Sequence, residues 1–124
     1  MGNYLAIAIG GTLGCWARYG ITEFIERFFG KSFPLATLII NVLGSFLMGF
    51  LFIEMLERVA LSPAVRAGIL TGGLGGFTTF STFSMEVVLL TEQGEPGKAA
   101  LYIILSVILG LVAAFGGVYV ARNL

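Results

Sequence analysis

The sequence predicts an all-α integral membrane protein with four transmembrane helices, the third of them broken in mid-membrane. Of its 124 residues, 57% are apolar and only 11% are charged, whereas about a quarter of the residues in a soluble domain are charged. The mean hydropathy is +0.97. Four apolar segments approach the length of about 20 residues that a spanning helix needs. This composition excludes a soluble globular protein and a disordered one.

Short connections that hold most of the charges separate the four segments. The predicted spans cover about residues 4–21, 35–53, 67–90 and 99–121. Within them only Arg18 and Glu86 are charged. Pro34, Pro63 and Pro96 each stand just before a span, where the start of a helix tolerates proline. No basic residue precedes the first span, so we expect it to be retained rather than cleaved as a signal peptide. Residues 1–124 are therefore expected to form one transmembrane domain.

The charge balance excludes several kinds of site. Seven Lys/Arg residues and seven Asp/Glu residues give a formal net charge of zero, so no basic surface for nucleic acid is expected. The absence of histidine excludes imidazole proton relays and the usual zinc sites. The single Cys15 excludes an internal disulfide.

Lys and Arg are also balanced between the two sides of the predicted membrane domain. One side carries Arg58, Arg66 and Arg122, and the other carries Arg27, Lys31 and Lys98. A chain with one fixed orientation normally has more of them on the cytoplasmic side. Two interpretations stay open: other signals fix the orientation, or the chain inserts both ways and pairs as an antiparallel homodimer.

Small and polar residues recur at helical spacing within the spans. The first span has Gly10, Gly11 and Gly14, the second has Thr37, Asn41 and Ser45, and the fourth has Tyr102, Ser106, Gly110 and Ala114. Such stripes usually pack membrane helices together. The hydroxyl groups could instead line a path for an ion. Asn41 fits either interpretation because its amide both donates and accepts hydrogen bonds.

The third span contains a poor helix sequence near its middle. Four of the five residues from Gly72 to Gly76 are glycine, and the β-branched Thr78 and Thr79 follow. A helix can break at membrane depth only where protein or a cavity covers the freed backbone, and carbonyls at such breaks can bind a cation. The alternative is a tightly packed glycine seam in an unbroken helix.

Two phenylalanines after this stretch share a predicted helix face. Phe80 and Phe83 are three residues apart, with Ser81 and Thr82 between them. Phenyl rings carry a positive edge, so ring edges beside hydroxyl groups could line a path for a small anion. No Lys or Arg lies between residues 67 and 97, which favours weak sites that release an anion quickly.

Three motifs resemble the Fluc/CrcB family of small bacterial fluoride channels, and the resemblance covers nearly the whole chain. They are the segments from Gly10 to Tyr19, from Asn41 to Phe46 and from Gly75 to Phe83. Cys15 stands where the family usually has alanine. The resemblance implies a passive channel in the bacterial inner membrane that exports cytoplasmic fluoride and protects the cell from its toxicity. It also implies two subunits in opposite orientations, with two pores and a central structural sodium.

The resemblance further implies roles for individual residues. The fluoride pathway would comprise Asn41, Phe80, Phe83, Ser81, Thr82, Tyr102 and Ser106. Arg18 would lie near the aqueous entrance and attract anions. The backbone carbonyls of Gly75 and Thr78 would hold the sodium ion.

Two other functions remain as alternatives. A small proton-coupled multidrug exporter has a similar size, but it needs a carboxylate in the middle of its first span, and residues 4–21 contain none. Glu86 would have to serve instead. It is a functional candidate because it is ionisable within a span, although it could equally lie at the interface or pair with Arg18. A membrane scaffold would explain the packing stripes but not the Thr/Ser/Phe run.

Overall fold

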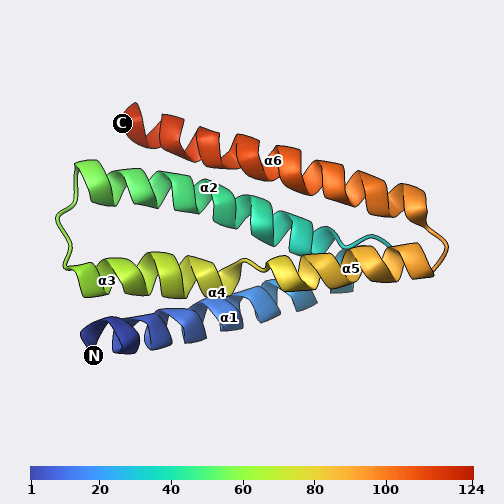
Figure 1. The fold of residues 1–124 in the computed structure, drawn as a ribbon, viewed down its shortest axis with the longest axis horizontal. Coiled ribbons are helices and arrows are strands. Elements are labelled where there is room, and N and C mark those ends of the chain that lie inside the picture. The colour runs from blue at the N-terminus through green and yellow to red at the C-terminus, as the bar shows by residue number, and fades with distance from the viewer.

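The computed structural model describes residues 1–124, and every regular element in it is helical. The elements are α1 (Gly2–Phe29), α2 (Leu35–Glu57), α3 (Pro63–Ala67), η1 (Gly68–Leu74), α4 (Gly75–Phe77), α5 (Phe80–Glu92) and α6 (Pro96–Arg122). Because α3 to α5 follow one another along one line, the chain forms four long helical segments, with both termini at the same end (Figure 1). The predicted all-α class and four segments are confirmed.

Three of these segments are long and apolar enough to cross a membrane: α2, the broken segment Pro63–Glu92, and α6. The first segment, α1, is not among them, although its 28 residues span about 42 Å against a hydrocarbon core of about 30 Å. Arg18, Glu23, Glu26 and Arg27 make α1 the most highly charged of the four. Its length and its outward apolar side chains match a spanning helix. It differs from the other three segments in its larger number of charged residues.

The first segment packs against η1 and α4 with the two backbones in contact. A Cβ atom added at Gly10 would overlap the carbonyl oxygen of Gly68, and one at Gly14 would overlap that of Gly73. On the facing helix, a Cβ atom at Gly72 would lie 2.6 Å from the carbonyl oxygen of Ile7. The predicted glycine packing of the first span is therefore confirmed.

A second close pair joins α2 to α6. A Cβ atom at Gly49 would overlap the carbonyl oxygen of Ala114, and one at Gly117 would overlap that of Phe46. The small residues of α6 thus pack helices together, as small-xxx-small spacing predicts. Gly110 is less crowded, because the nearest atom to an added Cβ there would be Oγ of Ser45 at 3.8 Å.

The third segment is broken as predicted, but the glycines do not form the break. Gly72 to Gly76 stay helical, first in the π-helix η1 and then in α4. The chain leaves the helix at Thr78 (φ −86°, ψ 158°) and Thr79 (φ −152°, ψ 121°). Extended conformations suit β-branched residues, while the glycines remain helical because α1 packs on them. The glycine seam and the broken helix, which the sequence posed as alternatives, occur one after the other.

Only 20 of the 124 residues are buried within the single chain. Large apolar side chains are exposed on every long segment, among them Trp16, Phe52, Met85 and Phe115. A surface of this kind needs lipid or another protein chain to cover it.

Candidate functional site

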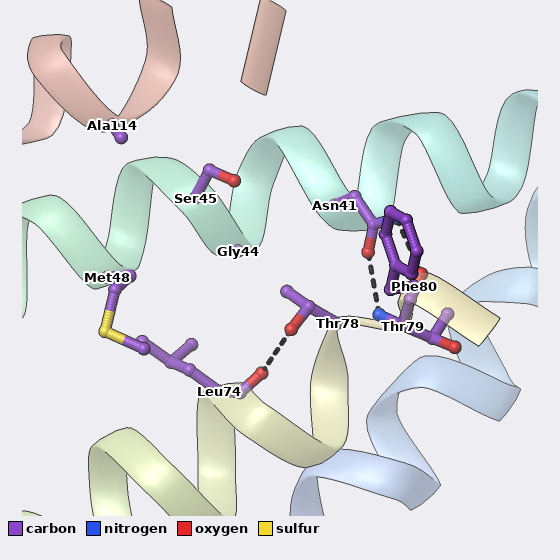
Figure 2. A pocket seen from close by; sticks show the side chains of 9 residues that line it. All are labelled: Asn41, Gly44, Ser45, Met48, Leu74, Thr78, Thr79, Phe80 and Ala114. Carbon is purple, nitrogen blue, oxygen red and sulfur yellow. Dashed lines mark hydrogen bonds between the residues drawn. The ribbon is translucent and has the colours of Figure 1, made fainter. Parts of the chain in front are cut away.

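A cavity of about 330 Å³ lies beside the break in the third segment (Figure 2). The residues that line it are Asn41, Gly44, Ser45, Met48, Leu74, Thr78, Thr79, Phe80 and Ala114. They come from α2, the broken segment and α6. The cavity therefore brings together two residues of the predicted fluoride pathway, Asn41 and Phe80, and one predicted sodium ligand, Thr78.

Asn41 forms hydrogen bonds with both backbone groups of Thr79. The backbone N–H of Thr79 donates to Oδ1 of Asn41 at 2.9 Å, and Nδ2 of Asn41 donates to the carbonyl oxygen of Thr79 at 3.0 Å (Figure 2). The two helices approach so closely that a Cβ atom added at Gly44 would overlap the side-chain methyl group of Thr78. One N–H of the Asn41 amide remains free for another acceptor.

The two threonines at the break themselves provide hydrogen bonds for some of the remaining backbone groups. The carbonyl oxygen of Leu74 accepts from the backbone N–H of Thr78 at 3.0 Å and from its hydroxyl at 2.9 Å. The hydroxyl oxygen of Thr79 accepts from the backbone N–H of Thr82 at 3.2 Å. Thr79 is thus the N-cap of α5, a role that its residue type favours and that we did not predict.

The carbonyls of Gly75 and Thr78 lose their ordinary helical donors at the break. In an unbroken helix, Gly75 would accept from the N–H of Thr79, and Thr78 from that of Thr82. These two N–H groups bind Asn41 and the Thr79 hydroxyl instead. Carbonyl oxygens at such breaks are typical sodium ligands, so both predicted positions fit the ion. Two oxygens are too few to enclose it on their own.

Arg18 binds the carbonyl that follows Gly75. Its Nε–H donates to the carbonyl oxygen of Gly76 at 3.1 Å. The suggested pairing of Arg18 with Glu86 is therefore wrong. The reason is that Arg18 follows the glycine crossing and reaches the end of α4, whereas Glu86 lies on α5 beyond the break.

Glu86 is held by hydroxyl groups from two other helices. The Tyr102 hydroxyl of α6 donates to Oε1 of Glu86 at 2.7 Å, and the Thr37 hydroxyl of α2 donates to Oε2 at 3.1 Å. Tyr102 is fully buried, among Leu38, Leu90 and Ala99. Its hydroxyl proton is engaged by the carboxylate, and Tyr102 does not line the cavity at the break. Sequence spacing gave no sign of this network, because it joins three separate helices.

A line of aromatic rings connects the two polar regions. The centroids of Phe80 and Phe83 are 5.5 Å apart, and those of Phe83 and Tyr102 are 5.0 Å apart. The prediction that Phe80 and Phe83 share a face is thus confirmed. Phe80 lines the cavity and is 78% exposed, so part of its ring has no neighbour within the single chain.

The other residues of the predicted pathway lie in two places. At the start of α5, the Thr79 hydroxyl donates to the Thr82 hydroxyl at 3.1 Å and lies 3.5 Å from that of Ser81. Ser106 is on α6, outside the cavity at the break. Its Oγ is buried and has no hydrogen-bond partner.

Replacing Asn41 with aspartate should destabilise the protein. Asn41→Asp keeps an acceptor for the Thr79 N–H but sets a carboxylate oxygen against the Thr79 carbonyl oxygen. We expect a loss of about 1–3 kcal/mol in the free energy of unfolding, measured as a lower midpoint of thermal unfolding in detergent. Ser45→Ala is the control, since Ser45 lines the same cavity without a hydrogen bond to lose. Equal midpoints for the two variants would contradict the assigned role of Asn41.

Comparison with known proteins identifies the family of the chain. A family model described as CrcB-like protein, Camphor Resistance (CrcB), matches residues 5–118. A protein named fluoride-specific ion channel FluC from Acidithiobacillus ferrooxidans is 55% identical over 117 residues, which cover 94% of each chain. One of the same name from Methylococcus capsulatus is 50% identical over 122 residues, 98% of this chain and 54% of that protein.

A further relative extends this match to the full length. The FluC protein of Geobacter sulfurreducens is 44% identical over the whole of both chains. By name these relatives are ion channels and not enzymes. The chain thus belongs to the CrcB family, as the motifs in its first, second and third segments predict.

Proposed function

We propose that this protein is a fluoride-selective passive channel that exports cytoplasmic fluoride and so protects the cell from fluoride toxicity. The relatives named as fluoride-specific channels support this. The observation that carries it is the cavity at the break, where the amide of Asn41, the ring of Phe80 and threonine hydroxyls meet without any Lys or Arg. Such a site attracts an anion weakly, and conduction requires that it also be released.

Fluoride is small and strongly hydrated, so the pathway must replace its water with hydrogen-bond donors. At the break, the free N–H of Asn41 and the hydroxyls of Ser81 and Thr82 supply these donors. The positive ring edges of Phe80 and Phe83 then extend the pathway along α5.

Beyond the rings, the pathway reaches Tyr102 and Ser106. The unpartnered Oγ of Ser106 supports its place there, and the contact between Phe83 and Tyr102 supports that of Tyr102.

Passive flow accounts for export without an energy source. Hydrogen fluoride is a weak acid that enters from acidic surroundings and dissociates inside, and the fluoride ion then leaves down its gradient. The chain has no nucleotide-binding motif that would support ATP-driven pumping. The protein would act in the bacterial inner membrane.

The working form in this proposal is an antiparallel homodimer in which each chain crosses the membrane four times. The length and outward apolar face of α1 support a fourth span. The balanced Lys and Arg residues support insertion in both orientations. The exposed ring of Phe80 supports a second copy at the break, where each of two pores would use groups from both chains.

A sodium ion at the centre of the dimer would bind the backbone carbonyls that the helix break leaves without donors. The carbonyls of Gly75 and Thr78 from each chain would hold it, which is supported by the loss of their helical donors. Bound there, the ion would supply positive charge that offsets the clustered carbonyl dipoles.

Liposomes that contain only the purified protein test the proposed function. We expect rapid fluoride efflux without chloride efflux, and a reduction of at least about tenfold in Phe80→Ile, because an aliphatic side chain has no positive ring edge. Phe115→Ile is the control, since Phe115 is similarly exposed but lies on α6 outside the cavity.

Two results of that experiment would contradict the proposal. Fluoride efflux that requires a proton gradient would exclude passive conduction. Equal fluoride and chloride efflux would exclude selectivity.

Labelling of single cysteines from one side of the membrane tests dual orientation. In a Cys15→Ala background, Ser32→Cys and Asn123→Cys place an exposed thiol at opposite ends of the helices. A reagent that cannot cross the membrane should label about half of either variant from outside the cell, because both orientations are equally populated. Full labelling of one variant and none of the other would mean a single orientation.

A further inference from the structure

Arg18 reaches the broken helix because of the glycine crossing that precedes it. Gly11 and Gly14 face the third segment, and a Cβ atom at Gly76 would lie only 2.9 Å from the carbonyl oxygen of Gly11. Arg18 follows Gly14 by four residues, so it lies on the same face one turn further along α1. Its partly buried Nε–H then meets the carbonyl oxygen of Gly76 at 3.1 Å.

The bonded carbonyl lies between the carbonyls of the two predicted sodium ligands. Gly76 follows Gly75 directly and precedes Thr78 by two residues. Gly75 and Gly76 belong to the carboxyl-terminal turn of α4, where carbonyl dipoles favour positive charge, and Thr78 is the extended residue that follows it. By engaging Gly76, Arg18 fixes the end of α4 while leaving the carbonyls of Gly75 and Thr78 free.

We propose that Arg18 is a positioning residue for the sodium site: its Nε–H holds the Gly76 carbonyl and thereby orients the carbonyls of Gly75 and Thr78 toward the ion. This role rests on the sodium site in the proposed function, and it differs from attraction of anions by the charge of Arg18. The first role needs a donor at the Nε position, and the second needs only the charge.

Two substitutions separate the hydrogen bond from the charge. In Arg18→Gln, the side-chain Nε2 is the same number of bonds from Cα as Nε of arginine, so a donor remains without the charge. In Arg18→Lys, the charge remains, but a carbon atom takes the place of Nε. The positioning role predicts that glutamine preserves the sodium site better than lysine does.

Thermal unfolding of the purified protein in detergent, with sodium replaced stepwise by N-methylglucamine, measures the sodium site without any fluoride. We expect sodium to raise the unfolding midpoint of the unsubstituted protein. Arg18→Gln should keep this rise, with a half-saturating sodium concentration no higher than that of the unsubstituted protein, because a neighbouring cation is removed. Arg18→Lys should raise that concentration about tenfold, as expected when one hydrogen bond is lost. Arg27→Gln and Arg27→Lys are controls on an exposed part of α1.

The sodium dependence of fluoride efflux provides a second readout, in which the half-activating sodium concentration should change in the same order. Loss of the sodium response in Arg18→Gln, or an unchanged half-saturating sodium concentration in Arg18→Lys, would overturn the positioning role. If the lysine variant does not fold, the glutamine variant still decides, since a lost sodium response there refutes the role.

The two proposals fail in different ways. An unsubstituted protein that conducts fluoride but gains no stability from sodium would overturn the role of Arg18 and leave the channel function intact. One that is stabilised by sodium but passes no fluoride would overturn the function and leave the role of Arg18 intact.

Discussion

A helix that breaks within a membrane must find partners for its freed backbone inside the protein, because lipid offers none. The third segment meets this requirement at Thr78 and Thr79 with help from two other helices. Asn41 of α2 pairs with both backbone groups of Thr79, and Arg18 of α1 engages Gly76. The threonine hydroxyls bind within the segment itself. The carbonyls of Gly75 and Thr78 have lost their ordinary helical donors and can face an ion.

The glycine crossings make these contacts possible. Arg18 can reach α4 only because α1 lies against the backbone of η1, and Asn41 can reach Thr79 only because Gly44 leaves room for Thr78. A side chain at either crossing would move the helices apart and remove the hydrogen bonds that stabilise the break. The hydrogen bonds at the break therefore depend on the close packing at the glycines. This dependence explains why the glycines and the break are adjacent in the sequence.

Sequence patterns predicted the elements that depend on local spacing. The spans, the glycine stripes, the shared face of Phe80 and Phe83 and the presence of a break all follow from periodicity and residue type. The position of the break does not, because glycines that look flexible in isolation become rigid when another helix packs on them. The threonines that follow then adopt the extended conformation.

Partners across the fold were harder to predict. Arg18 is 58 residues from Gly76, and Thr37 is 49 residues from Glu86. No pattern along one helix specifies such a pairing, and the alternative in which Glu86 pairs with Arg18 is wrong. The fold gives each of them a different partner: Arg18 bonds to a carbonyl at the end of α4, and Glu86 accepts from two hydroxyls.

In the proposed dimer, an ion shared between two inverted chains binds the backbone carbonyls that the helix break frees. A structure of the protein determined in lipid nanodiscs with sodium would show whether this arrangement exists. We expect two inverted copies that meet at Thr78, with density for one ion between the carbonyls of Gly75 and Thr78 from both. Copies that lie parallel, or a carbonyl of Gly75 that is already bound to a donor of the protein, would contradict it.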